Sequence, residues 1–132
     1  MKYLIDSHVL LWSLMKPSEL SPKVKAILND PFNSIYVSAV SHFELSLKYS
    51  LDKLDLEDFK PEDLMSEASI IDFLELPLTT EDAVGLYLLD FKEHKNPFDK
   101  MLLWQAVRNK LKFVSRDSRV ASYSKYGLEI IW

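Results

Sequence analysis

Four acidic side chains, Asp6, Glu44, Asp99 and Asp117, occupy positions from which they could act together. Asp6 and Asp117 each follow a short apolar run that predicts a strand, whereas Glu44 and Asp99 lie on the inward side of predicted helices. Two carboxylates about 5 Å apart repel by roughly 3 kcal/mol at an effective dielectric of 20, so converging acids need protons or a divalent cation to neutralise them. An all-oxygen site without cysteine suits Mg²⁺ or Mn²⁺.

Asp99 also has a purely structural interpretation. The segment "NPFDKMLLWQA" begins a helix with Asn96 as N-cap and Pro97 in the first helical position, and an acid in the first turn stabilises the helix dipole by roughly 0.3 to 1 kcal/mol. Against this, the residues three, four and seven positions further on share the face of Asp99 and are all apolar: Leu102, Leu103 and Ala106. A capping role and an inward-facing functional role both stay open.

The other three acids have structural alternatives as well. Asp6 and Asp117 could each cap a helix that follows a strand. Glu44 lies two turns inside its helix, where it could pair with Lys48 at i+4, and a capping box with Ser41 would require a helix that begins later than predicted. The apolar stripe beside Glu44 consists of Val40, Phe43, Leu47 and Leu51.

The composition indicates one globular domain over residues 1–132. Of the 132 residues 48% are apolar, enough for a core that buries roughly two thirds of the unfolded surface. The lack of cysteine excludes disulfide scaffolds and thiolate sites, and it fits a reducing compartment such as the cytoplasm. The run "YLIDSHVLLW" is interrupted by Asp6 and His8 and has no small-residue cleavage site, so we expect neither a signal peptide nor a membrane span.

The formal net charge of −4 is unevenly distributed. Residues 92–125 carry nine Lys or Arg against three acids, a balance of +6, whereas residues 1–91 carry seven against sixteen, a balance of −9. This asymmetry is compatible with a basic surface that meets phosphate, and equally with solvated helix faces of opposite sign. The stretch from Asp52 to Asp82 holds eleven acids and two lysines, and we expect it to form an exposed face.

Apolar periodicity predicts strands and helices in alternation. The predicted strands are residues 2–5, 34–38, 71–77, 112–115 and 128–132. The predicted helices are residues 7–15, 21–30 (capped by Ser21), 38–50, 61–69, 81–90 (capped by Thr79 or Thr80), one that opens at Asn96 and a short one from Ser118, with an acidic loop at 51–60. This alternation favours a three-layer α/β/α domain with a mainly parallel central sheet. Ligands of such sheets bind beyond the carboxyl ends of the strands, where Asp6 and Asp117 lie.

Other site chemistries lack support in the sequence. The chain has only two glycines, so it contains no glycine-rich phosphate loop. His8, His42 and His94 show neither a helical pair nor zinc-ligand spacing, and no nucleophile elbow accompanies a Ser-His-Asp triad. We expect these histidines at the surface or in hydrogen bonds, although His94, just before the Asp99 helix, stays open as a functional residue.

Four segments together resemble the PIN-domain nucleases, specifically the small VapC-type toxins of bacterial and archaeal toxin-antitoxin pairs. They are "YLIDSHVLLW", "VSAVSHFELSLK", "HKNPFDKMLLWQA" and "FVSRD", in the order and at the approximate spacing of that family. The resemblance covers essentially the whole chain, and it implies a PIN-like fold and a metal-dependent endoribonuclease activity. The acidic residues carried over by motif are Asp6, Glu44, Asp99 and Asp117.

The resemblance extends to positions beside these acids. Ser7 and Ser115 match positions where the family tends to have a hydroxyl, and we expect them to assist in holding metal, water or phosphate. Asn96 stands where many relatives have a further Asp, which lowers the local charge. Lys100 replaces the usual Arg, so it keeps the positive charge but loses a bidentate phosphate fork. Because the four principal acids are intact, we expect activity.

The resulting hypothesis is hydrolysis of RNA phosphodiester bonds by a water activated on one or two Mg²⁺ or Mn²⁺ ions. Asp6, Asp99 and Asp117 would face the metal, and Glu44 would bind it or orient the water. The bases expected to contact phosphate are Lys100, Arg116 and Arg119.

Protein partners are implied by the resemblance alone. It implies a neighbouring antitoxin that wraps the toxin and blocks the acidic pocket, and a toxin homodimer. Trp12, Trp104 and Trp132 could belong to such interfaces, although we expect at least two of them in the core.

Other functions stay open from the sequence. A binding module with the same fold could pair with a partner in a DNA-binding repressor complex without useful catalysis. A metal-dependent phosphatase or DNA nuclease would have a similar acidic pocket. A phosphate-accepting receiver domain fits less well, because one Asp rather than a clustered pair ends the first strand.

Overall fold

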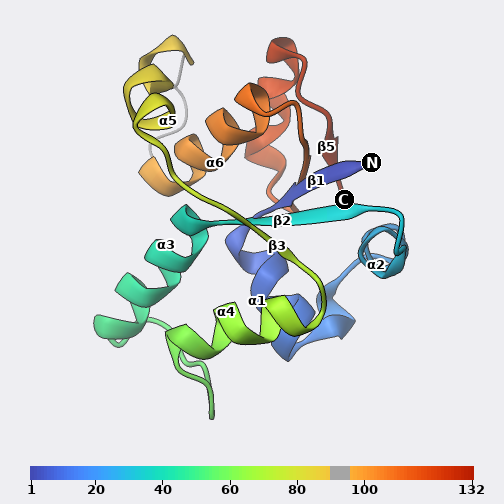
Figure 1. Cartoon of the computed structure of the whole chain (residues 1–132), viewed down its shortest axis with the longest axis vertical. Helices are drawn as coiled ribbons and strands as arrows, with labels where there is room; N and C mark the ends of the chain where they lie inside the picture. The colour runs from blue at the N-terminus through green and yellow to red at the C-terminus, as the bar shows by residue number, and fades with distance from the viewer. Residues whose placement is uncertain (90–95) are drawn as a thin grey trace.

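The computed structural model describes residues 1–89 and 96–132, and it centres on a parallel sheet (Figure 1). Within the described residues the sheet has five strands in the order β3-β2-β1-β4-β5. The strands are β1 (Lys2–Ile5), β2 (Ser34–Ser38), β3 (Leu74–Leu76), β4 (Lys112–Val114) and β5 (Ile130–Ile131). The α-helices are α1 (Ser7–Met15), α2 (Pro22–Asn29), α3 (Ala39–Ser50), α4 (Pro61–Ile70), α5 (Thr80–Gly85) and α6 (Pro97–Arg108). The described residues also form the 3₁₀ segments η1 (Pro17–Glu19), η2 (Leu86–Leu88) and η3 (Ser118–Tyr126).

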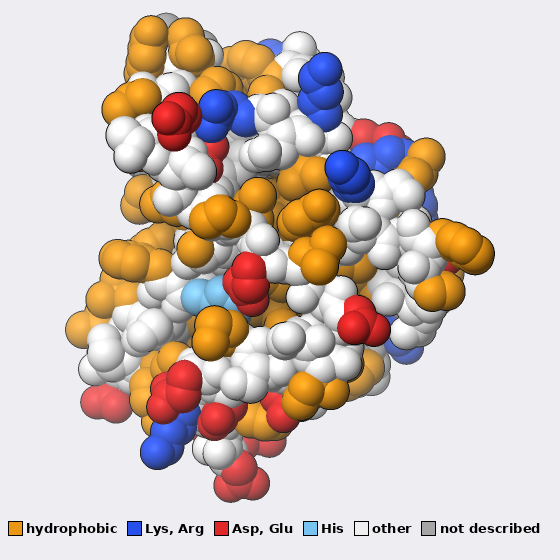
Figure 2. Space-filling view, in the orientation of Figure 1, with side chains coloured by type: hydrophobic (Ala, Val, Ile, Leu, Met, Phe, Trp, Pro, Cys, Tyr) orange, Lys and Arg blue, Asp and Glu red, His pale blue; other side chains and the backbone are white. Residues whose placement is uncertain are grey.

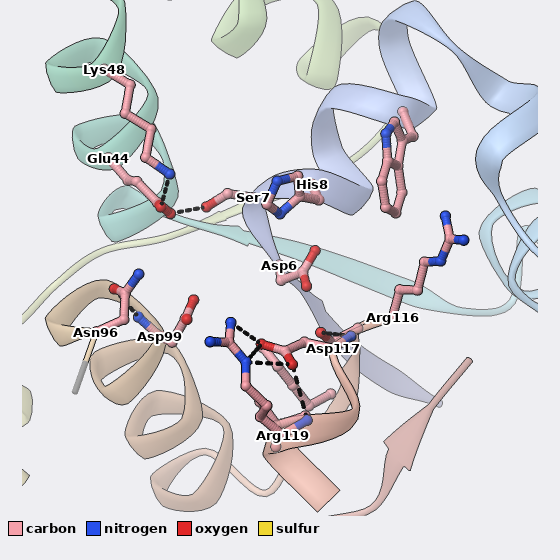
Figure 3. A pocket seen from close by; sticks show the side chains of 14 residues that line it. Asp6, Ser7, His8, Glu44, Lys48, Asn96, Asp99, Arg116, Asp117 and Arg119 are labelled. Carbon is pink, nitrogen blue, oxygen red and sulfur yellow. Dashed lines mark hydrogen bonds and ion pairs between the residues drawn. The ribbon is translucent and has the colours of Figure 1, made fainter. Parts of the chain in front are cut away.

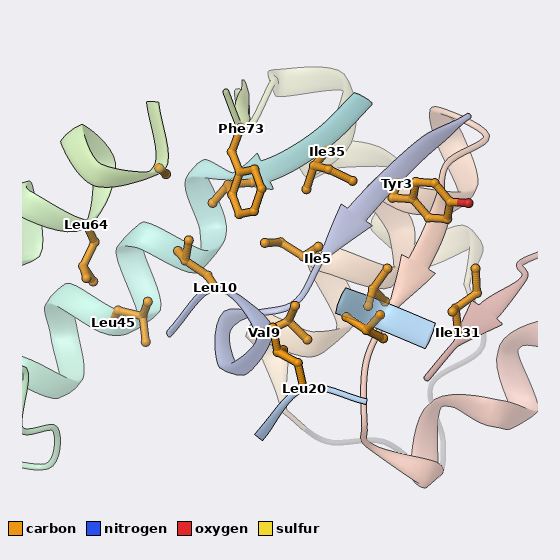
Figure 4. Packing of buried hydrophobic residues seen from close by; sticks show 14 of the residues in the cluster. Tyr3, Ile5, Val9, Leu10, Leu20, Ile35, Leu45, Leu64, Phe73 and Ile131 are labelled. Carbon is orange, nitrogen blue, oxygen red and sulfur yellow. The ribbon is translucent and has the colours of Figure 1, made fainter. Parts of the chain in front are cut away.

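The sheet separates two hydrophobic clusters. Successive side chains of β1 alternate between them, because a strand presents its residues to opposite faces: Tyr3 and Ile5 join one cluster and Leu4 joins the other. The first cluster packs α1 to α4 against the sheet (Figure 4), and the second packs α6 and η3 against the opposite face. The predicted three-layer α/β/α architecture with a parallel sheet is therefore confirmed.

The strand register brings the carboxyl ends of the three central strands to one level. Ile5 of β1 lies beside Val37 of β2 on one side and beside Val114 of β4 on the other. The helix that follows β1 packs on one face of the sheet and the segment that follows β4 packs on the opposite face. In open α/β sheets a crevice that binds ligands forms where the connections from two neighbouring strands leave on opposite faces of the sheet. Asp6 and the residues after β4 lie at such a place.

Several predicted elements differ from the observed ones in length or type. The predicted strand at 71–77 is reduced to Leu74–Leu76, because Asp72 takes a left-handed backbone conformation (φ 64°) in the turn that ends α4. The predicted strand at 128–132 is reduced to Ile130–Ile131. The predicted helix at 81–90 divides into α5, capped by Thr79, and η2, and its last residue lies outside the described part of the chain.

Helix α3 buries a different face from the one suggested by its apolar stripe. Val40 is buried, but Phe43, Leu47 and Leu51 are exposed by 63%, 40% and 52%. The buried face instead carries Ser41 and Glu44 with Val40 and Leu45. The apolar stripe was thus a misleading guide to the inward direction, because a polar site rather than apolar core adjoins this helix.

The uneven charge distribution is visible on the surface (Figure 2). Acidic side chains gather over the α4 region, and Lys and Arg gather toward the opposite end of the molecule. The acidic stretch forms a mostly exposed face as expected, with one exception: Asp82 is buried and pairs with Arg108 of α6. Among the described residues, no helix has the length and apolar character that crossing a membrane requires.

Candidate functional site

The carboxyl ends of the central strands open into a pocket of about 450 Å³. All four predicted acids line it, although they come from four separate segments of the chain (Figure 3). The predicted hydroxyls Ser7 and Ser115 line it as well. The remaining lining residues are His8, Trp12, Lys48, Asn96, Phe113, Arg116, Arg119 and Val120.

Asp6 combines a capping role with a buried position in the pocket. It is the N-cap of α1, where its Oδ1 accepts a hydrogen bond of 2.8 Å from the backbone N–H of Val9. Burial raises the pKa of this carboxyl, and the negative charge of Asp99 raises it further, although hydrogen bonds from Ser115 and Val9 act in the opposite direction. A nearby cation would relieve both unfavourable effects on the ionised form.

Glu44 is held from two sides inside the pocket wall. Its side chain is nearly fully buried, its Oε1 accepts a hydrogen bond of 2.7 Å from Ser7 Oγ, and its Oε2 lies 2.6 Å from Lys48 Nζ. The i+4 pair with Lys48 that the sequence allowed is present, whereas the capping box with Ser41 is excluded because Ser38 caps α3. Glu44 therefore stays fixed next to the first turn of α1 (Figure 3).

Asp99 does not act as the N-cap of its helix. Asn96 caps α6, with its Oδ1 accepting hydrogen bonds from the backbone N–H groups of Phe98 (2.9 Å) and Asp99 (3.3 Å). The Asp99 side chain is partly buried and lines the pocket. Its first-turn position still meets the helix dipole, so the structural and pocket-facing interpretations hold together.

A buried glutamine fixes α6 relative to α3. Gln105 of α6 is fully buried; its Oε1 accepts a hydrogen bond from Ser38 Oγ, at the N-cap of α3. Its Nε2 donates to Asp82 Oδ2 at 3.0 Å. Because α3 carries Glu44 and α6 carries Asp99, this bridge sets the spacing of two of the four acids.

Asp117 pairs with a base from its own loop. It caps η3 by accepting from the backbone N–H of Arg119 at 2.9 Å, and the Arg119 guanidinium donates to both of its carboxylate oxygens. The hydrogen bonds and charge of Asp117 raise the pKa of Arg119, with a smaller contribution from Asp99. Figure 3 shows the Arg119 side chain between these two carboxylates. Of the bases predicted to contact phosphate, Arg116 also lines the pocket, whereas Lys100 does not.

Comparison with protein families identifies the architecture. The model of the PIN domain family matches residues 3–126. The chain belongs to the PIN domain family. This family is one of nucleases. A search among curated proteins finds no match.

Solved structures similar to this PIN domain span nearly its whole length. VapBC2 from Rickettsia felis, bound to a DNA fragment from its promoter, has a TM-score of 0.70 at 14% identity and covers 99% of this chain and 98% of its own. VapBC-1 from nontypeable Haemophilus influenzae has a TM-score of 0.65 at 12% identity, covering 99% and 97%. FitAcB from Neisseria gonorrhoeae has a TM-score of 0.59 at 18% identity, covering 100% and 97%. At these identities the likeness shows the shared fold.

The donor set of the PIN domain pocket fits a hard divalent cation. The donors are carboxylate, hydroxyl and amide oxygens, and the buried Asp6 beside Asp99 carries a charge that a cation would stabilise. In the arrangement seen here, no three His, Asp or Glu side chains of residues 1–89 and 96–132 are gathered closely enough to surround an ion. Asp117 and Glu44 are paired instead with Arg119 and Lys48.

Sequence patterns were a weaker guide to three residues of this PIN domain pocket. Lys48 was predicted only as a helix partner of Glu44, and His8 was expected at the surface or in a hydrogen bond. Trp12 was expected to be in the core or an interface; it packs partly against the core and also lines the pocket. Of the other tryptophans, Trp104 is buried and Trp132 is partly buried. His94 lies outside the described residues.

Proposed function

We propose that this PIN domain is a metal-dependent endoribonuclease that hydrolyses RNA phosphodiester bonds and acts as the toxin of a toxin-antitoxin pair. The observation that carries the proposal is the convergence of four carboxylates from four chain segments on one pocket: Asp6, Glu44, Asp99 and Asp117. The same pocket contains the bases Arg116 and Arg119, which would attract a polyanion.

Asp6, Asp99 and Asp117 would hold Mg²⁺ or Mn²⁺. When bound, the ion would activate a water and polarise the phosphoryl oxygen. Asp117 would exchange its ion pair with Arg119 for the cation, which leaves the Arg119 guanidinium to contact a phosphate oxygen. Ser115 lies beside Asp6 in the pocket and favours the ionised form of its carboxyl.

Glu44 would orient the attacking water rather than bind the ion directly. Each of its carboxylate oxygens already has a donor, Ser7 Oγ or Lys48 Nζ, at 2.7 Å or less. A carboxylate oxygen keeps a second acceptor position after it accepts one hydrogen bond, so Glu44 can still accept from a water. Ser7 and Lys48 fix the direction in which it does so.

The protein partners belong to the same proposal. We propose a cytoplasmic antitoxin partner and a homodimer, on the basis of the resemblance to VapC-type toxins. Apolar side chains available for protein contacts are exposed on α3, where the ring centroids of Phe43 and Phe98 of α6 lie 5.7 Å apart. Light scattering of the purified chain should give about twice its mass of 15.4 kDa, and a single-chain mass would contradict the dimer.

Cleavage of RNA by the purified chain tests the enzymatic proposal. A mixed RNA pool is incubated with Mn²⁺, Mg²⁺ or EDTA, with the native chain and with Asp6→Asn and Asp99→Asn. Loss of an outer-shell partner costs roughly 10- to 100-fold in activity, so loss of a direct metal contact should reduce the rate by at least about 100-fold. Asp58→Asn, the same change at an exposed acid outside the pocket, is the matched control.

Each alternative function has its own outcome. Metal-dependent cleavage that disappears in both pocket variants and persists in the control supports the proposal. No cleavage by a folded native chain, with no effect of metal on its thermal stability, favours a binding module. Faster cleavage of DNA or of a small phosphoester than of RNA favours a DNA nuclease or a phosphatase.

A further inference from the structure

An aromatic and cationic group forms one wall of the same pocket. His8 and Trp12 lie one turn apart on α1, with ring centroids 5.6 Å apart and a tilt of 38°. The Arg116 guanidinium lies over the Trp12 ring, 5.8 Å from its centroid. All three side chains line the pocket. Figure 3 shows Arg116 on one side of Asp6, with Glu44 and Asp99 on the other.

Packing accounts for only part of the position of Trp12. Trp132 supports it from one edge, with centroids 5.8 Å apart at 61°, and both rings pack against the core cluster of the α1 face. These contacts hold the indole rigidly, yet Trp12 remains partly exposed toward the pocket. A rigid, supported aromatic ring beside a phosphate-attracting site is the arrangement that unpaired nucleobases bind by stacking.

We propose that Trp12, flanked by His8 and Arg116, forms a stacking subsite for an unpaired nucleobase next to the scissile phosphate. This inference rests on the proposed ribonuclease function and gives it a substrate class: single-stranded RNA in which a base adjoining the cleaved bond is unstacked. A base-paired strand keeps its bases stacked inside the duplex, so it cannot offer one to the indole.

The geometry between indole and guanidinium suits a base after a small displacement. A base lying between them needs two contact spacings of about 3.5 Å, roughly 7 Å in total, against the observed 5.8 Å. Arg116 can supply the difference, because its side chain is 57% exposed and its ion pair with Glu19, at 3.3 Å, is at the surface. The guanidinium plane can then stack on the second face of the base.

An abasic-site experiment tests the subsite. Fluorescein-labelled single-stranded oligoribonucleotides, intact or with one abasic nucleotide at successive positions, are titrated in Ca²⁺ with anisotropy as the readout, and the same strands are cleaved in Mn²⁺. With the native chain, one abasic position beside the cleavage site should weaken binding about tenfold and raise KM with little change in kcat. In Trp12→Leu the intact strand should bind about tenfold more weakly, and the abasic change should have no further effect.

Two variants separate stacking from general effects. Trp12→Phe keeps an aromatic face and should recover most of the affinity. Phe32→Leu removes an aromatic ring that is 90% exposed and does not line the pocket, so it should bind both strands like the native chain. Thermal unfolding of each variant verifies that the fold is retained.

The possible outcomes distinguish this inference from the proposed function. Equal affinity of native and Trp12→Leu chains for intact RNA overturns the subsite and returns Trp12 to a protein interface. An abasic effect that persists unchanged in Trp12→Leu places the recognised base elsewhere and also overturns it. If the native chain neither binds nor cleaves any RNA, both proposals fail; if it cleaves intact and abasic strands with one KM, only the subsite fails.

Discussion

Replacing Lys48 by Met should destabilise the fold, because the buried Glu44 loses one of its two side-chain partners. Glu44 keeps only its hydrogen bond from Ser7, and its side chain is 5% exposed, whereas that of Lys48 is 39% exposed. Removing one member of a fully buried ion pair costs about 3–5 kcal/mol and of a surface pair about 0–1 kcal/mol. For this half-exposed pair we expect a loss of about 1–2 kcal/mol in the free energy of unfolding.

Thermal and urea unfolding in EDTA measure this loss. At about 2.1 cal/mol/K per residue, unfolding 132 residues carries an entropy of roughly 0.28 kcal/mol/K, so the melting temperature should fall by about 4–7 °C. Adding Glu44→Gln should restore most of the loss, because the buried position then carries no charge. The double-mutant cycle should give a coupling of about 1–2 kcal/mol between the two side chains.

An exposed lysine provides the control for this cycle. Lys16 pairs with Glu19 at 3.4 Å, with exposed fractions of 66% and 34%, so Lys16→Met should change stability by less than about 0.5 kcal/mol. Equal melting temperatures for Lys48→Met and Lys16→Met, or a coupling below about 0.5 kcal/mol, would refute the view that Lys48 stabilises the buried side chain of Glu44 in the pocket wall.

Three further substitutions test other features of the fold. Burial and the charge of Asp99 raise the pKa of Asp6 above its ordinary value of 3.8. The native chain should therefore lose stability as the pH rises from 3.8 through the raised pKa of the folded state. Over that pH range, urea unfolding should show Asp6→Asn gaining stability relative to the native chain. Burial opposes ionisation of Asp82, but hydrogen bonds from Gln105, the Thr79 N–H and Arg108 lower its pKa. Asp82→Asn should therefore cost about 1–3 kcal/mol near neutral pH, and the deficit should shrink as pH falls below 3.8; a deficit independent of pH would contradict this assignment. Gly85→Ala would place a Cβ 2.7 Å from the Trp104 ring and should lower the free energy of unfolding by about 1–3 kcal/mol, whereas a stabilised variant would show that the ring moves freely.

Local chemistry made much of the fold predictable. Asn96 and Ser21 were identified as helix caps, and Thr79 as one of two candidates, because a cap depends on a side chain and a backbone N–H only two or three residues away. Strand alternation likewise depends on neighbouring residues, so β1 and β2 have the predicted bounds. The edge strands β3 and β5 were predicted too long, since each pairs with one neighbouring strand only, among the described residues, and β3 begins after the left-handed turn at Asp72.

The amino-acid sequence was enough to predict which residues could form a site, because two acids follow strands and parallel strands end at one edge of their sheet. It left open whether Glu44 and Asp99 face that edge. The tertiary structure decided this: α3 turns Glu44 rather than its apolar stripe inward, since Ser7 and Lys48 satisfy the buried carboxylate there. It also decided that Trp12 borders the acids, because helix α1 places one side of the indole on the core and the other in the pocket. The spacing of apolar residues in the sequence cannot specify this division.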